Sequence, residues 1–202
     1  MLFRSQRSNT GLASAGKTRS ETLTSGFGRY EIDLGRSTLY AGLGHAERFP
    51  DYWELISQGK QSLGSNSAFD TRPEKTTQLD IGSIYRDGRW SASVSGFYNL
   101  IRDYILIDNS QTLKTALLTR NIDATTWGGE AGVAYAIDSK WKADATVAYV
   151  RGNNDNDGTA LAQLPPLEGR LGLTYDNKVW SVGSLLRLVA AQDRFDLKEG
   201  NI

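Results

Sequence analysis

From residue 26 onward, apolar and polar side chains alternate one by one along much of the sequence. The runs 127–137, 141–149 and 170–175 show the pattern clearly. In the run 90–100 one parity is apolar and the other is mostly serine, the apolar parity being Trp90, Ala92, Val94, Gly96, Tyr98 and Leu100. A period of two places each parity on one face of a β-strand, whereas a helical period of 3.6 would mix the two sets. The sequence therefore predicts strands.

Short turn signals and longer polar segments divide these runs. The turn signals are Gly35-Arg36, Asp87-Gly88, Asp138-Ser139-Lys140 and Asp176-Asn177-Lys178, each joining two runs directly, as in a hairpin. Longer polar segments lie at 48–75, 107–120 and 152–164. About eight strands result, at 26–34, 37–46, 76–86, 89–105, 118–137, 139–151, 166–176 and 178–192. Several reach the roughly 9–11 residues that a tilted strand needs to cross a bilayer.

Aromatic residues gather near the ends of these strands, with small or aliphatic residues between them. The predicted aromatic girdle comprises Trp90, Tyr98, Trp127, Tyr135, Trp141, Tyr149, Tyr175 and Trp180. Amphipathic rings are most stable where hydrocarbon meets headgroups and water, which favours a membrane barrel. We expect Trp90, Trp141 and Trp180 to share the convex face, just inside the rim of short turns. A soluble β-sandwich with the rings in its core is the alternative, since both classes show alternation.

Composition narrows the range of functions. Lys+Arg and Asp+Glu number 23 each, which disfavours a nucleic-acid partner because phosphate contacts need surplus cations. The absence of Cys excludes disulfides, thiolate metal sites and a Cys nucleophile. No run approaches 18 apolar residues, so no transmembrane helix is expected. In hydrocarbon every strand must pair, so strands of this kind are expected to belong to a closed barrel.

Four segments resemble the barrel of TonB-dependent outer-membrane receptors. Residues 44–55 (GHAERFPDYWEL) resemble the family's Gly-x-x-x-Arg-Phe-Pro/Ala-x-x-x-Glu-Leu loop, and residues 72–76 (RPEKT) its Lys-Pro-Glu-Lys-Thr segment. Residues 121–130 (NIDATTWGGE) resemble an Asn-x-x-x-Ala-x-x-x-Gly-x-Glu strand, and residues 164–170 (LPPLEGR) an Ile-Pro-Pro strand entry. The order is that of the family. Together with residues 29–34 (RYEIDL), the first segment is most similar to the copper-receptor subgroup.

The resemblance implies an all-β fold, an antiparallel up-and-down transmembrane β-barrel of about 22 strands, of which this chain holds about eight. It divides the chain into a polar N-terminal segment or loop at 1–25, a partial barrel at 26–192 and an external loop or truncated end at 193–202. Residues 1–25 show no signal-peptide pattern. The plug domain, the TonB-box segment and the last strands are expected to lie outside this sequence.

The function implied is energy-coupled uptake of a scarce ligand across the Gram-negative outer membrane, with copper or a metal chelate as the candidate. The implied partners are outer-membrane lipid, the plug domain and the TonB system, and no cofactor is implied. A complete eight-stranded outer-membrane barrel, acting as an adhesin or structural protein, is a second interpretation. The soluble sandwich, as a binding module, is the third.

Few side chains in the sequence suggest a metal-binding or catalytic site. His45 is the single imidazole and a weak metal candidate, since copper sites pair His with Met or Cys and the one Met is residue 1. Residues 153–158 (NNDNDG) begin like a calcium loop, but Leu164 stands where an acidic ligand should be, so an external loop is favoured. No Ser lies in a nucleophile context, and the strand carboxylates fit a water-facing lumen. An enzyme is not expected.

Overall fold

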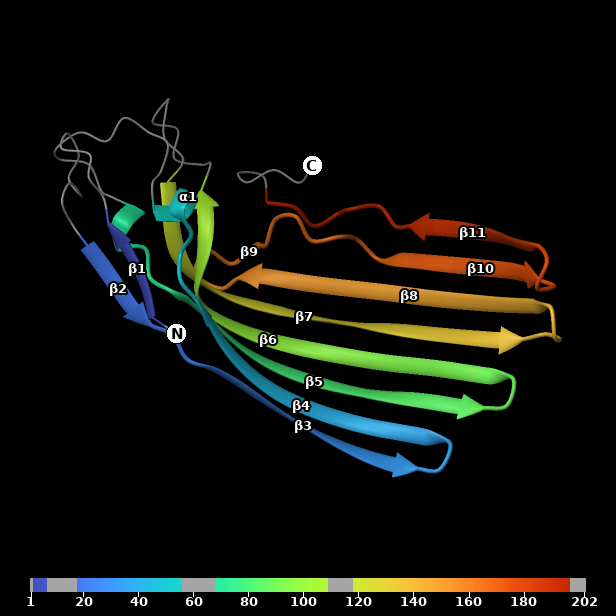
Figure 1. Cartoon of the computed structure of the whole chain (residues 1–202). Coiled ribbons are helices and arrows are strands. Elements are labelled where there is room, and N and C mark those ends of the chain that lie inside the picture. Colours follow the sequence, from blue (N-terminus) through green and yellow to red (C-terminus); the bar gives the residue numbers. More distant parts are fainter. Residues whose placement is uncertain (1, 7–17, 56–67, 109–117, 197–202) are drawn as a thin grey trace.

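The computed structural model describes residues 2–6, 18–55, 68–108 and 118–196. Its main sheet runs in chain order, each strand antiparallel to the next, with the short β9 beside β8 (Figure 1). The strands are β3 (Ser25–Leu34), β4 (Ser37–Arg48), β5 (Glu74–Asp87), β6 (Trp90–Asp108), β7 (Leu118–Ala136), β8 (Trp141–Asn154), β9 (Thr159–Ala160), β10 (Glu168–Asp176) and β11 (Ser181–Val189). All eight predicted strands are confirmed, with ends within three residues of those expected.

The N-terminal segment differs from expectation. It contains an antiparallel pair, β1 (Leu2–Gln6) and β2 (Thr18–Thr22), in a separate two-stranded sheet. Strand β2 reads Thr-Arg-Ser-Glu-Thr and has no apolar parity, so the alternation that revealed the other strands is missing here. The part expected to be a polar segment or loop therefore forms a hairpin before β3 begins.

The four predicted short turns are confirmed, and local chemistry accounts for them. Gly35 and Gly88 have φ of 71° and 54°, left-handed values that Gly adopts without a steric penalty. In the third turn, the Asp138 carboxylate accepts hydrogen bonds from the backbone N–H groups of Lys140 and Trp141, at 2.7 and 2.8 Å. In the fourth turn, the side-chain oxygen of Asn177 accepts a hydrogen bond from the backbone N–H of Trp180 at 2.7 Å. All four lie at one end of the sheet, the short-turn end (Figure 1).

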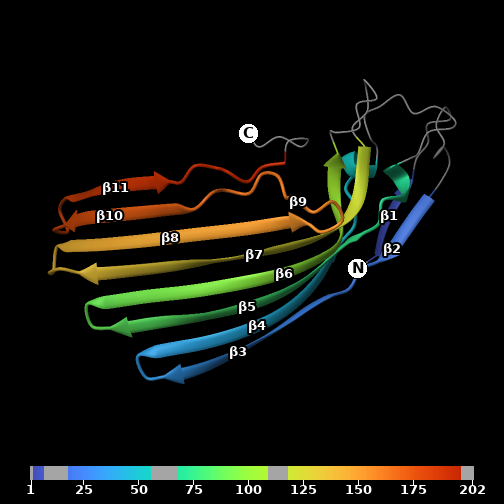
Figure 2. The same cartoon turned by 180° about the vertical axis from the view of Figure 1, so that it is seen from behind.

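The sheet is curved and open. Its order ends at β3 on one side and β11 on the other, and within the described residues these two edges do not pair. The strands form a trough when seen from either side (Figures 1 and 2). The interpretation as a complete eight-stranded barrel is therefore wrong, because closure would require β3 to pair with β11. A sandwich is also excluded, since one long sheet carries the fold.

At the opposite end of the strands, the loop end, the structure is irregular. Helix α1 (Tyr52–Leu55) and the 3-10 turn η1 (Ala68–Asp70) lie there, and a register shift interrupts the β6–β7 ladder between Ile101 and Tyr104. A small cluster of buried side chains, Ile122, Ala124 and Leu161, packs at this end. The described residues contain no helix long and apolar enough to span a membrane.

Candidate functional site

Cross-strand register assigns every side chain of the main sheet to one of two faces, since directly paired residues project to the same side. Trp90 pairs with Tyr135, Tyr98 with Trp127, and Trp141 with Tyr175. The parity of Tyr149 and Trp180 adds them to the same face, because Tyr149 pairs with Gly129 of β7 and Val182 pairs with Tyr175. All eight predicted girdle residues thus lie on one face, which we call the apolar face.

On the apolar face the rings form two rows. The short-turn row is Trp90, Tyr135, Trp141, Tyr175 and Trp180, and the loop-side row is Tyr98, Trp127 and Tyr149. Rings touch within each row, with centroids 4.4 Å apart for Trp90 and Tyr135, 4.9 Å for Trp141 and Tyr175, and 5.7 Å for Trp127 and Tyr149.

The two rows are eight residues apart along β6, β7 and β8 alike, as from Trp90 to Tyr98. Eight residues of strand span about 26 Å along the strand, which is about 20 Å of height at a tilt of about 40° and falls within the roughly 25 Å apolar band of an outer-membrane barrel. Between the rows lies a band of aliphatic side chains, the apolar band, which includes Ile81, Ala92, Val94, Val133, Ala145, Val147, Leu171 and Leu173. Val94 lies halfway between the rows and is 54% exposed.

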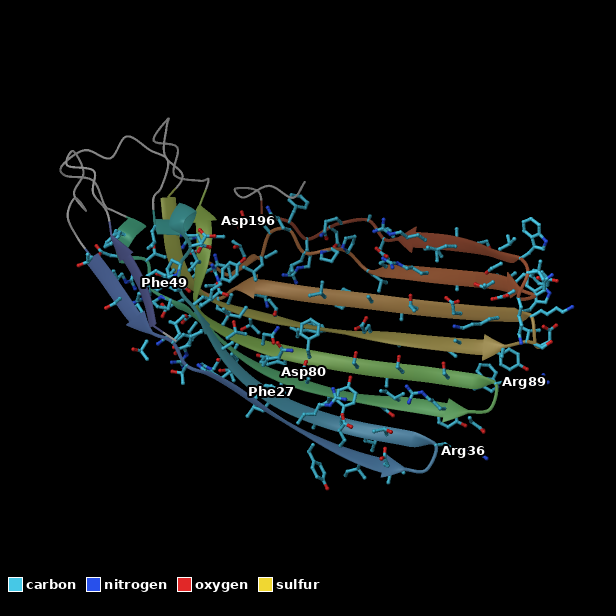
Figure 3. All side chains as sticks on the ribbon, viewed as in Figure 1. Phe27, Arg36, Phe49, Asp80, Arg89 and Asp196 are labelled. Atoms are coloured by element: carbon cyan, nitrogen blue, oxygen red, sulfur yellow. The ribbon has the colours of Figure 1, made fainter. Side chains whose placement is uncertain are left out.

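The other face is polar and concave. A hollow of about 900 Å³ is lined mostly by residues of this parity from β3 to β7, among them Phe27, Asp80, Phe97 and Glu130. Arg29 contacts Glu31 at 2.6 Å and lies over the Tyr40 ring at 4.0 Å from the ring centroid. Figure 3 labels Phe27 and Asp80 on these strands. Because the hollow opens on the polar face, the apolar face is the convex one.

His45 has the parity of the apolar face, toward the loop end, and it is also among the residues at the edge of the hollow. Its Nδ1 lies 3.0 Å from the Thr77 hydroxyl, and its Nε2 lies 3.7 Å from a Glu47 oxygen. Across the described ranges, no three His, Cys, Asp or Glu residues form a group that could hold a metal ion. The polar neighbours of His45 are thus a hydroxyl and a carboxylate, and its assignment to the rim stays a prediction.

The Arg-Phe-Pro-x-x-x-Glu-Leu segment forms a tied corner at the loop end. The Arg48 guanidinium contacts Glu54 at 2.7 Å and Glu74 at 3.2 Å, and its hydrogen bonds to Glu54 raise the Arg48 pKa. Glu54 also accepts a bond from the backbone N–H of Asp51, while the Asp51 carboxylate accepts one from the N–H of Glu54. This reciprocal pair caps α1 and places Leu55 in a buried position.

The calcium-like segment 153–158 is an anchored loop. The Asn154 side chain accepts from the N–H groups of Asn156 and Asp157 and donates to the Asp157 carboxylate at 2.9 Å. Asp157 also pairs with Arg120 of β7, and Asp155 accepts a bond from the Thr125 hydroxyl at 2.6 Å. The oxygens that resembled a cation site hold the loop to the neighbouring strand.

Sequence reasoning missed two residues that organise the loop end. Arg19 of β2 donates to the carbonyl oxygens of Phe69, at 3.1 Å, and Thr71, and its guanidinium lies over the Phe49 ring. Asn121 exchanges hydrogen bonds with both backbone groups of Arg72. Figure 3 shows Phe49 at this end. Arg72 and Asn121 lie in segments that carry the family resemblance, but nothing in the sequence indicates that they meet.

Comparison with known proteins agrees with the barrel architecture described above. A family model described as "TonB dependent receptor-like, beta-barrel" matches residues 4–201. The solved structure titled "Copper transporter OprC" is 48% identical over 94% of this chain, with a TM-score of 0.86. The FrpB iron transporter from Neisseria meningitidis (F3-3 variant) is 17% identical over 93% of this chain, with a TM-score of 0.67, and so shares the fold. This chain spans 30% of the length of each. Comparison with curated proteins finds no match.

The matched proteins are receptors and transporters rather than enzymes. The family match runs beyond the 26–192 segment on both sides and so includes most of the N-terminal hairpin. An aromatic-bounded apolar face, a polar concave face and sequential hairpins are the features that a section of such a barrel should have. The chain therefore belongs to the TonB-dependent receptor family of the Gram-negative outer membrane, and comprises part of its β-barrel.

Proposed function

We propose that this chain is a section of a TonB-dependent transporter that takes up copper across the outer membrane. The observation that carries the proposal is 48% identity to a copper transporter over 94% of the chain, well above the 17% identity to an iron transporter of the same fold. Uptake would require the plug domain and the TonB system as partners. Neither belongs to the described residues, so this section alone is not expected to transport.

The eight aromatic residues are proposed to mark the two membrane–water interfaces. Their support is the pairing of rings in two rows and the aliphatic side chains between them. Rings of this kind gain most where one edge meets hydrocarbon and the other meets water. The polar face would then line the lumen, where Asp80 and Glu130 remain hydrated or contact the plug.

Copper transport is tested in cells that express the full-length protein containing this chain. We expect radioactive copper to accumulate only when both this protein and TonB are present, and to stop accumulating when the proton gradient is collapsed. Uptake of an iron chelate in place of copper would contradict the ligand but not the transport class. Accumulation of neither, with the protein folded in the outer membrane, would contradict the transport proposal.

His45→Ala is the matched control in the same assay. Because His45 lies on the apolar face and contacts Thr77 and Glu47, we expect copper uptake by this variant to remain within twofold of the parent. A loss of uptake with an unchanged amount of folded protein would make His45 part of the ligand path. At least one copper ligand would then lie on β4.

A further inference from the structure

A basic residue lies in each of the four short turns of the main sheet. These residues are Arg36, Arg89, Lys140 and Lys178. They connect β3 to β4, β5 to β6, β7 to β8 and β10 to β11, so they lie at the same end of the sheet. Figure 3 shows Arg36 and Arg89 at that end, beyond the strands.

The four charges differ in how far they are neutralised. Arg36 pairs with Asp87 at 2.6 Å. Arg89 donates one hydrogen bond, at 3.2 Å, to the carbonyl oxygen of Ile137. In the part of the chain that the structure describes, no ion pair joins a carboxylate to Arg89, Lys140 or Lys178. We call these three residues the cation row.

Nearby acidic residues do not cancel the cation row by direct pairing, because their oxygens are bound to the turn backbone. Asp138 accepts from the backbone N–H groups of Lys140 and Trp141. Asp176 accepts from the backbone N–H of Lys178 at 2.7 Å. The carboxylates thus shape the turns, while the side-chain ammonium groups stay exposed to solvent.

The cation row adjoins the short-turn row of rings. Trp90 directly follows Arg89, Trp141 follows Lys140, and Trp180 is two residues after Lys178. Interfacial rings mark the headgroup level, and long cationic side chains extend from there into the polar zone. In barrels of this class short turns face the periplasm. The row therefore lies at the height of the phosphate groups of the periplasmic leaflet.

The spacing of the row suits a membrane surface better than one small anion. Neighbouring hairpins are two strand spacings apart, about 10 Å, so Arg89 and Lys178 at the two ends of the row are about 20 Å apart and a single phosphate cannot bind all three members. A leaflet containing anionic lipids offers a phosphate to each member. Attraction of cationic side chains to such a surface strengthens with each added charge.

We propose that Arg89, Lys140 and Lys178 form a binding surface for anionic phospholipid headgroups of the periplasmic leaflet. The proposal rests on the lipid-facing orientation of the apolar face argued above. Phosphatidylglycerol is a suitable probe because its headgroup is anionic and carries no amine.

The test uses the full-length protein in nanodiscs of zwitterionic lipid containing one fifth phosphatidylglycerol. The triple variant Arg89→Gln, Lys140→Gln and Lys178→Asn removes the three charges, with Asn chosen because φ at position 178 is +69°. The fraction of phosphatidylglycerol among lipids retained by the protein is measured by mass spectrometry. Losing one charge should weaken binding of anionic lipid by about fivefold, so we expect the triple variant to retain at least fivefold less phosphatidylglycerol.

The matched control removes three exposed cations from the polar face, which faces the lumen and not the lipid: Arg29→Gln, Arg86→Gln and Lys142→Gln. It should change retention by less than twofold. Equal retention by the parent and the turn variant would overturn the proposal. So would competition by 10 mM inorganic phosphate, which would indicate a site for free anions.

Quenching of Trp fluorescence by brominated lipid tests separately whether the apolar face contacts lipid, which the proposal assumes. Strong quenching in parent and variant, together with lost lipid retention, supports both. Strong quenching with unchanged retention overturns the cation row alone. Absence of quenching in the parent overturns the proposed orientation of the apolar face, and the proposal with it.

Discussion

The loop end and the apolar band of this barrel section differ in how their hydrophobic side chains are covered. Every described hydrophobic residue that is buried lies at the loop end: Leu55, Phe69, Ile105, Ile122, Ala124 and Leu161. The apolar band, by contrast, leaves its large side chains uncovered, as with Ile81 at 54% exposure. The loop end packs against itself as a soluble protein does, whereas the apolar band, in the proposed orientation, would be covered by lipid.

The backbone is also regular in the apolar band and irregular at the loop end. Between the aromatic rows the ladders are regular, which the proposed hydrocarbon environment would require, since any unpaired N–H or C=O there would cost several kcal/mol. Beyond the loop-side row, β6 shifts register near Asp103, whose φ is 57°. Here side chains can replace lost ladder bonds, and Asn121 accordingly donates to the carbonyl oxygen of Asp103 at 2.7 Å. Irregular backbone is tolerated where water or polar side chains can satisfy it.

Truncating one side chain in each region should give the largest contrast. Ile122→Ala leaves a cavity among buried neighbours and should lower the free energy of unfolding by about 2–5 kcal/mol. Ile81→Ala should cost less than about 1 kcal/mol, because lipid chains fill the space and are as apolar as the side chain. Guanidinium unfolding of the full-length protein in phospholipid vesicles, followed by Trp fluorescence, measures both. Similar losses for the two variants would contradict a division between two solvents.

A charge placed on each face of β6 tests which face meets lipid. Val94→Arg puts a cation near the midplane of the bilayer and should destabilise the protein by about 2–4 kcal/mol. The neighbouring change Ser93→Arg puts the same charge on the polar face, where the cost should stay below about 1 kcal/mol. The same unfolding assay applies. Equal costs, or a larger cost at residue 93, would reverse the assignment of the faces.

Most of the fold and one half of the candidate site could be predicted because alternation is local. Parity alone placed Trp90, Trp141 and the other rings on one face, and turn chemistry placed the hairpins. The loop end could not be read in this way. Arg19 reaches the carbonyl oxygens of residues 69 and 71, and Asn121 reaches Arg72, through contacts that join chain segments about 50 residues apart. Such contacts depend on the completed sheet, and no periodic signal encodes them.

Two glycine variants on the polar face of β7 test how closely the strands approach one another, through their effect on stability. A Cβ at Gly128 would lie 2.4 Å from the Tyr149 carbonyl oxygen, a backbone atom that cannot move aside easily. Gly128→Ala should therefore cost about 1–3 kcal/mol. At Gly132, four residues along the same face, the nearest atoms would lie at 3.5 Å, and Gly132→Ala should be tolerated. Equal unfolding midpoints for the two variants would contradict the tight β7–β8 approach.

The smallest expected change in stability concerns the turn between β7 and β8, which is capped by the ionised, solvent-exposed carboxylate of Asp138. The backbone N–H groups of Lys140 and Trp141 hold the pKa of Asp138 below its ordinary value of 3.8. The unfolded chain therefore takes up this proton first as the pH falls. The stabilisation is complete well above pH 3.8 and disappears as the pH drops through the lower pKa of the folded state.

Asp138→Ala should accordingly lower the unfolding midpoint slightly at pH 7, and its difference from the parent should shrink toward pH 3. Asn177→Ala is the matched control, because Asn177 caps the next turn through an uncharged oxygen at 2.7 Å from the Trp180 nitrogen. Its effect should be the same at both pH values. If the two variants showed the same pH dependence, the charge on Asp138 would not be its cause. The turn would then be stabilised by cap geometry alone, as expected for a rim in contact with water.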